Sequence, residues 1–75
     1  MKVLLFGIIS DITGKEELIL NGFKDTGALD QQLQKDYPGL KKVTYRIAVN
    51  KEIINVNTLL NDSDEVALLP PFAGG

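Results

Sequence analysis

The final residues of the chain, Pro70-Pro71-Phe72-Ala73-Gly74-Gly75, hold its clearest capacity for chemistry. Proline fixes φ at about −65° and favours an extended course, and glycine has no side chain. This segment therefore predicts a stiff stem and a thin, flexible tip that can enter a narrow tunnel. The reactive group that it would present is the α-carboxylate of Gly75. The competing interpretation is a frayed chain end without a function.

The composition excludes most other chemistry. The 75 residues include no Cys and no His, which excludes the usual zinc sites and both Cys–His and Ser–His–Asp catalysis. We therefore expect no bound metal, no bound cofactor and no catalysis by this chain alone. The formal net charge of −2 argues against a nucleic-acid partner. Because no apolar run approaches the roughly 20 residues of a membrane span, we expect a cytoplasmic protein with no membrane partner.

Local patterns predict the elements that must position this tail. Alternating or continuous apolar residues indicate strands at 3–9, 16–20, 43–49, 53–56 and 65–69. A turn or short helical turn is expected at 10–14. Leu29, Leu33 and Tyr37 recur every fourth residue and predict one amphipathic helix. We expect Thr26 to cap its start and Pro38 to end it.

This order of elements predicts an α+β fold of the β-grasp type. One main helix crosses one face of a mixed five-stranded sheet, and the first and last strands lie parallel at its centre. A parallel pair needs a long crossover connection, which the intervening helix supplies. Residues 1–70 would form the β-grasp domain, and residues 71–75 would form an extended Gly-Gly tail.

Apolar residues on the outer face of the predicted sheet indicate a partner interface. The first and last strands are apolar at nearly every position, whereas the helix covers one face of the sheet. If Phe6 and Leu69 point outwards on adjacent strands, they form an apolar patch near the tail, and Ile53 extends it. The competing interpretation places these residues in the core or leaves them as isolated exposed side chains. Phe72, which has no core to join, would anchor the tail in a groove of the partner.

Three stretches resemble the small, sulfur-carrier subunit of molybdopterin synthase, a ubiquitin-like family. They are Lys2-Val3-Leu4-Leu5-Phe6, Ala48-Val49-Asn50-Lys51-Glu52, and the segment from Asp64 to Gly75. The Pro-Pro before the Gly-Gly favours this family over the thiazole-pathway sulfur carrier, which is similar in its Gly-Gly end. The chain departs from the family in having Ser10-Asp11 where members often have Arg-Glu. It also has Asp62-Ser63-Asp64-Glu65 where many have Asp-Gly-Asp-Glu.

This resemblance implies a cycle centred on Gly75. An adenylating enzyme of the ubiquitin-activating type would use ATP to activate the Gly75 carboxylate, and a sulfur donor protein would convert it to a thiocarboxylate. The large synthase subunit, in a heterotetramer, would receive the tail and pass the sulfur to a pterin precursor during molybdenum cofactor biosynthesis. The residues presenting the carboxylate would be Pro70, Pro71, Phe72, Ala73 and Gly74.

Three alternatives stay open at this point. The chain could carry sulfur for thiamine synthesis or tRNA thiolation. It could be a ubiquitin-like modifier attached to target lysines. It could also be an interaction domain with an idle Gly-Gly end.

Overall fold

A computed structural model of the chain describes residues 1–70. The predicted tail, 71–75, lies outside the described residues, so its division from the domain stays a prediction. Five strands form one sheet in the order β2-β1-β5-β3-β4. Their bounds are β1 Lys2–Leu5, β2 Glu17–Ile19, β3 Arg46–Val49, β4 Glu52–Ile54 and β5 Glu65–Leu69. The helices are α1 Ile8–Thr13, α2 Thr26–Asp36 and the 3₁₀ turn η1 Pro38–Lys42.

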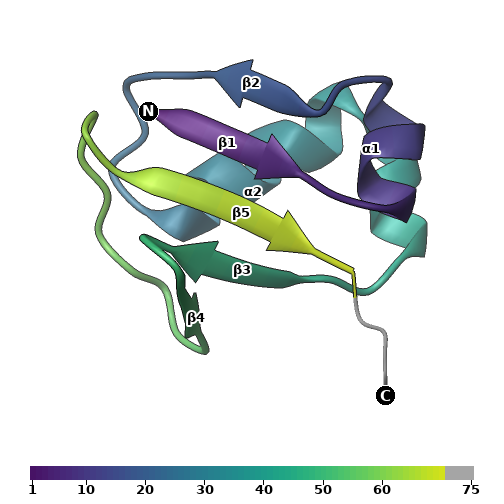
Figure 1. The fold of residues 1–75 in the computed structure, drawn as a ribbon. Helices are drawn as coiled ribbons and strands as arrows, with labels where there is room; N and C mark the ends of the chain where they lie inside the picture. Colours follow the sequence, from purple (N-terminus) through teal and green to yellow (C-terminus); the bar gives the residue numbers. More distant parts are fainter. Residues whose placement is uncertain (71–75) are drawn as a thin grey trace.

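The sheet is mixed, and its parallel pair lies at the centre. Strands β1 and β5 run parallel, with Leu5 opposite Leu68. The pairs β1–β2, β3–β5 and β3–β4 are antiparallel. Figure 1 shows α2 crossing one face of this sheet and leaving the other face uncovered by helices. The predicted fold class, an α+β β-grasp with one main helix, is therefore confirmed.

Alternation along the central strands separates core from surface. Val3 and Leu5 on β1 and Val66 and Leu68 on β5 are between 0% and 2% exposed. They pack against the α2 stripe formed by Leu29 and Leu33, which are also buried. Successive strand side chains point to opposite faces, so the residues between these four lie on the outer face.

The predicted first strand is too long. Strand β1 ends at Leu5, and the apolar run continues as helix α1. Gly7 has a φ of 55° and breaks the extended course. The carbonyl groups of Phe6 and Gly7 then accept the first helical N–H bonds. Ile9, in this helix, is fully buried in the core. Periodicity cannot distinguish a short buried strand from a buried helical turn, which explains the error.

The predicted helix cap is also wrong by one residue. The carboxylate of Asp25, not Thr26, accepts from the Ala28 N–H at 2.8 Å. That bond, with a second from Asn57, lowers the pKa of Asp25. Thr26 is buried, and its hydroxyl donates to Asn57 Oδ1 at 3.2 Å and accepts from the Thr58 N–H at 3.0 Å. Thr26 therefore ties α2 to the β4–β5 connection.

The remaining strands differ from prediction mainly at their ends. Strand β5 has its predicted bounds, whereas β2, β3 and β4 are shorter. The residues before β3 follow η1, which occupies the predicted Pro38 turn. A tight turn joins β3 to β4. Asn50 and Lys51 have φ values of 50° and 73° between the paired Val49 and Glu52, as in a two-residue hairpin turn.

Candidate functional site

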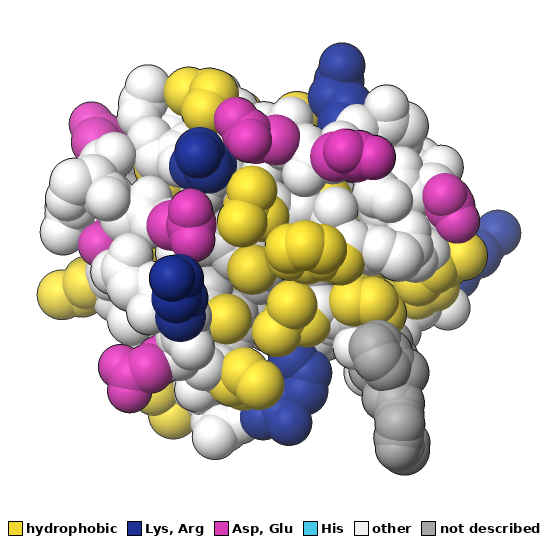
Figure 2. Space-filling view, viewed as in Figure 1, with side chains coloured by type: hydrophobic (Ala, Val, Ile, Leu, Met, Phe, Trp, Pro, Cys, Tyr) yellow, Lys and Arg dark blue, Asp and Glu magenta, His cyan; other side chains and the backbone are white. Residues whose placement is uncertain are grey.

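The uncovered face of the sheet carries a shallow apolar hollow of about 370 Å³. Figure 2 shows its hydrophobic side chains gathered over the central strands. We call them the outer-face patch: Leu4, Phe6, Ala48, Ile53, Ala67 and Leu69. The charged residues Lys51 and Glu65 also line the hollow.

Strand register places these side chains in one row. Leu4 on β1 lies opposite Ala67 on β5, Ala67 lies opposite Ala48 on β3, and Ala48 lies opposite Ile53 on β4. The row therefore crosses four strands. The two alanines have the smallest side chains in it and lie at its centre. The hollow follows from this order, because larger side chains flank small ones.

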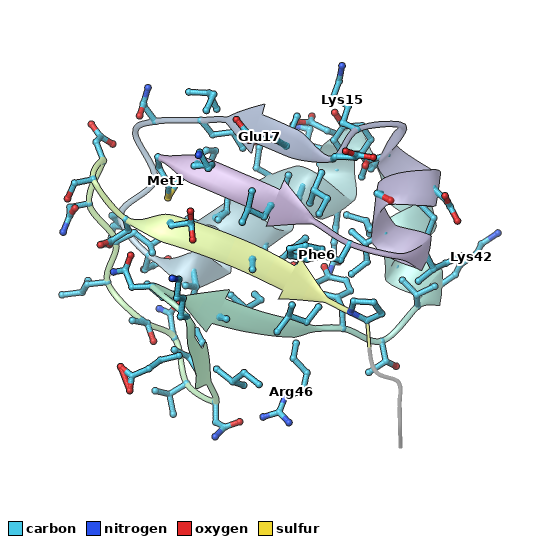
Figure 3. All side chains as sticks on the ribbon, viewed as in Figure 1. Met1, Phe6, Lys15, Glu17, Lys42 and Arg46 are labelled. Carbon is cyan, nitrogen blue, oxygen red and sulfur yellow. The ribbon has the colours of Figure 1, made fainter. Side chains whose placement is uncertain are left out.

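Phe6 and Leu69 extend the patch toward the end of β5. Figure 3 shows Phe6 over the sheet beside that end, and Leu69 is the last residue of β5, directly before Pro70. The patch thus reaches the point where the described part of the chain ends. Any partner that covers it would lie beside Pro70, the last described residue.

All three predicted interface residues belong to this patch. Phe6 is 45% exposed and Ile53 is 49% exposed, so the alternative that placed them in the core is wrong. Leu69 is half-buried. Their contact with a partner stays a prediction. Reasoning from sequence missed Leu4, Ala48 and Ala67 as site residues. The signal that could have found them is that each alternates with a core residue on its strand.

The acidic turn before β5 is braced by internal hydrogen bonds. The Asp64 carboxylate accepts from the Asn50 side-chain amide and from the Asn61 N–H, both at 2.9 Å. These two bonds lower the pKa of Asp64, the Asn50 bond most. Asn50 Oδ1 also accepts from the Glu65 N–H at 3.0 Å. Asp64 therefore joins the turn to the β3–β4 hairpin and has a structural role.

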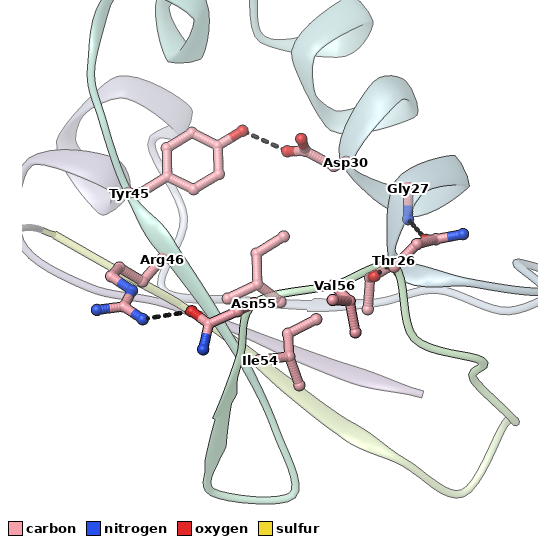
Figure 4. A pocket seen from close by; sticks show the side chains of 10 residues that line it. Thr26, Gly27, Asp30, Tyr45, Arg46, Ile54, Asn55 and Val56 are labelled. Carbon is pink, nitrogen blue, oxygen red and sulfur yellow. Dashed lines mark hydrogen bonds between the residues drawn. The ribbon is translucent and has the colours of Figure 1, made fainter.

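A second hollow, of about 360 Å³, lies between α2 and the β3–β4 hairpin (Figure 4). The Tyr45 hydroxyl there donates to the Asp30 carboxylate and accepts from the Gln34 amide. Burial, aided by the bond to Asp30, raises the pKa of Tyr45 to about 12. A phenol with that pKa is no general base near neutral pH. Arg46 donates to Asn55 at 2.8 Å. The Tyr45 bonds thus join α2 to the residue before β3, and the Arg46 bond joins β3 to the residue after β4.

Metal-binding clusters and membrane-spanning helices are two further features to consider among the described residues. Residues 1–70 contain no cluster of three acidic side chains placed to hold a metal ion. None of the helices in that range has the length and apolar character needed to cross a membrane.

The fold and the outer-face patch define a class, a ubiquitin-like β-grasp domain. The chain belongs to the ThiS family, which it matches over residues 3–75. That match includes the terminal Gly-Gly.

Individual relatives agree with the sequence resemblance. The chain is 41% identical to the molybdopterin synthase sulfur carrier subunit of Mycobacterium tuberculosis, over 100% of this chain and 96% of that protein. A complex of subunits 1 and 2 of molybdopterin-converting factor from Helicobacter pylori 26695 contains a similar chain. That chain gives a TM-score of 0.74 at 36% identity, with 99% of this chain and 96% of that chain covered.

A third similar protein has a different description. It is the small archaeal modifier protein 1 of Methanosarcina acetivorans, whose solution structure gives a TM-score of 0.84 at 30% identity. The similarity covers 99% of this chain and 94% of that chain.

Proposed function

We propose that this chain is the sulfur-carrier subunit of a molybdopterin synthase. The observation that carries the proposal is its 41% identity, over its whole length, to a molybdopterin synthase sulfur carrier subunit. The fold supports it, because the described residues supply an apolar face that reaches Leu69, directly before Pro70. The chain would therefore act as the carried reagent in a reaction that its partners catalyse.

The chemistry would take place at Gly75. A carboxylate is a poor electrophile, because its oxygen is a poor leaving group. Attack by the carboxylate oxygen on the α-phosphorus of ATP releases pyrophosphate and forms a mixed anhydride with AMP. A persulfide on a donor protein then attacks the carbonyl carbon through its terminal sulfur, and AMP leaves, which gives an acyl disulfide. A second thiol of a partner protein attacks the donor's sulfur in that S–S bond. This forms a disulfide between donor and thiol and releases the Gly75 thiocarboxylate. ATP would bind to the activating partner, so this chain needs no cofactor and no metal of its own.

The outer-face patch is the proposed contact with the large synthase subunit. Phe6, Ile53 and Leu69 offer exposed or half-buried apolar surface, and Leu69 directly precedes Pro70. Burial of such surface stabilises association and places the tail at the partner's active site. The Helicobacter pylori complex, which joins a similar chain to a second subunit, supports this partner. The expected assembly is a heterotetramer with two copies of each subunit.

Intact mass spectrometry tests the carrier function. The chain is incubated with ATP, the activating enzyme and the sulfur donor of its source organism. We expect replacement of one terminal oxygen of Gly75 by sulfur. A chain that lacks Gly75 is the matched control, because it loses the reacting residue and no core residue. An unmodified terminus under all conditions, or loading of the shortened chain, would contradict the proposal.

A ubiquitin-like modifier is the second candidate. The observation that favours it is the TM-score of 0.84 to an archaeal modifier protein. A modifier would attach the Gly75 carbonyl to a lysine amine of a target protein. The same mass measurement separates the two functions, because a modifier gives protein-sized adducts. Carriers for thiamine synthesis or tRNA thiolation would load in the same way and differ in the acceptor of the sulfur.

A further inference from the structure

Gly7 and Pro70 pack against each other where β5 ends. The parallel pairing of β1 and β5 stops at Leu5 opposite Leu68. Two residues further along each strand are Gly7 and Pro70. A Cβ atom built on Gly7 would lie 2.9 Å from Pro70 Cγ and 3.8 Å from Pro70 Cβ. Real Cβ atoms do not approach a carbon that closely, so the contact needs glycine at position 7.

The backbone at Gly7 has a second need for glycine. Its φ of 55° and ψ of −131° lie outside the regions open to residues with a Cβ. The conformation is held in place by its neighbours. The Gly7 carbonyl accepts from Ser10 Oγ at 2.9 Å and from the Asp11 N–H at 3.2 Å. The buried Ile9 anchors the same helix in the core. These contacts thus hold the Gly7 backbone in place against Pro70.

The position of Pro70 depends on its contact with Gly7 more than the position of another residue type would. Proline has no N–H, so the sheet cannot hold it through a donated hydrogen bond. On its other side, the pairing of β5 with β3 ends at Leu69 opposite Arg46. Packing of the proline ring on Gly7 is therefore the contact that directs the chain as it leaves β5.

We propose that Gly7 is a positioning residue for the tail, acting through Pro70. The inference rests on the proposed function, in which residues beyond Pro70 present the Gly75 carboxylate to partner enzymes. Phe6, which belongs to the outer-face patch, directly precedes Gly7. Phe6, in the proposed docking surface, and Gly7, which contacts Pro70, are therefore neighbours in the sequence. A docked partner would therefore meet Pro70 directly beside its own contact with Phe6.

The first test replaces Gly7 with Ala and measures adenylation by pyrophosphate release, with the activating enzyme that accepts the unaltered chain. Misdirected reacting groups lower turnover without loss of binding, so we expect kcat to fall by about 10- to 100-fold. The KM for the carrier should stay within about twofold. A normal kcat for Gly7→Ala, or an effect on KM alone, would overturn the inference.

Two other glycines provide matched controls. Gly14 has a φ of 74°, and a Cβ placed on it would meet no atom within 4 Å, so Gly14→Ala introduces backbone strain away from the tail. A Cβ on Gly39 would lie 2.9 Å from Ile12 Cγ2, so Gly39→Ala introduces crowding away from the tail. Both variants should keep the kcat of the unaltered chain. An equal fall in kcat for either control would mean that Gly7 acts through general destabilisation, against the proposal.

Pro70→Ala tests the contact from its other side and removes no core side chain. It should lower kcat in the same direction as Gly7→Ala. Because both changes break one contact, the double variant should be no slower than the slower single variant. Multiplied effects would show independent action and overturn the inference.

An NMR measurement tests the contact without any partner. The Gly7 hydrogen that takes the place of a Cβ should give a strong NOE to the Pro70 ring protons, and Gly7→Ala should abolish it. Absence of this NOE in the unaltered chain would overturn the inference even if Gly75 is adenylated. Conversely, a chain that shows the NOE but is never adenylated would contradict the proposed function alone.

Discussion

At the scale of single residues, the described side chains include some that are bonded within the fold and others that are exposed on the sheet. Tyr45 and Asp64 are held in hydrogen bonds within the fold, whereas Phe6 and Ile53 are left exposed on the sheet. This division separates side chains that stabilise the fold from apolar side chains exposed on the open face of the sheet.

Phe6→Asp should weaken binding to the large synthase subunit by about tenfold or more, because it places a charge in the apolar contact. The melting temperature should change little, since Phe6 is 45% exposed. Isothermal titration and thermal unfolding measure the two effects. Leu59→Asp is the matched control, because Leu59 is 77% exposed and lies outside the patch. Equal loss of affinity in both variants would argue against a specific interface.

Tyr45→Phe should lower the free energy of unfolding by about 1 kcal/mol near neutral pH, because Asp30 and Gln34 lose their shared partner. The pKa of Tyr45 is about 12 in the folded chain and ordinarily 10.0. The unfolded chain therefore loses this proton first as pH rises, and the contribution of Tyr45 is lost between pH 10 and about 12. Urea unfolding across that range should show the unaltered chain and Tyr45→Phe converging. Parallel curves would contradict this assignment.

At the scale of elements, the β4–β5 connection holds the start of α2. Asn57 Oδ1 accepts from the Gly27 N–H at 2.7 Å and from the Thr26 hydroxyl at 3.2 Å. The Thr26 N–H donates to the Thr58 carbonyl at 2.9 Å. These bonds satisfy donors that the first turn of a helix cannot pair internally. Residues that follow β4 thus complete a helix that begins far earlier in the sequence.

Asn57→Ala should therefore lower the free energy of unfolding by about 1 kcal/mol, since it removes the acceptor for Gly27 and Thr26. Asn55→Ala is the control, because the Asn55 side chain accepts from the exposed Arg46 on the surface. It should change stability by less than about 0.5 kcal/mol. Chemical denaturation gives both values. Equal effects would show that the helix start does not depend on Asn57.

At the scale of the whole molecule, one α-helix covers one face of the sheet and leaves the other for a partner. The row Leu4–Ala67–Ala48–Ile53 joins four strands across that open face. Its hollow of about 370 Å³ can receive an apolar side chain from outside. The sheet thus carries both the outer-face patch and Leu69, which directly precedes Pro70.

Ala67→Leu should fill this hollow and weaken docking of the large subunit by about tenfold, if a partner side chain enters it. Stability should change little, because Ala67 lies on the outer face. Ala67→Ser keeps the side chain small and should bind more tightly than Ala67→Leu. Titration gives the affinity, and thermal unfolding gives the melting temperature, of the unaltered chain and the two variants. Unchanged binding of Ala67→Leu would place the contact elsewhere on the molecule.

Much of this arrangement could be predicted because its signals are local. The bounds of β5, the α2 stripe and the stop at Pro38 follow from periodicity and from the backbone limits of proline. The first strand could not be bounded in the same way. Val3 to Ile9 is apolar throughout, and the change from strand to helix occurs at a glycine whose φ depends on its neighbours.

The sequence alone determined the fold class and the alternation that leaves apolar residues on an outer face, and it predicts the tail. Each depends on residue type and short-range order along the chain. Only the tertiary structure decided that Ala48 and Ala67 form the hollow, that Thr26 bonds to the β4–β5 connection, and that Gly7 faces Pro70. These contacts join residues far apart in sequence, so they depend on strand register and packing, which no local pattern specifies.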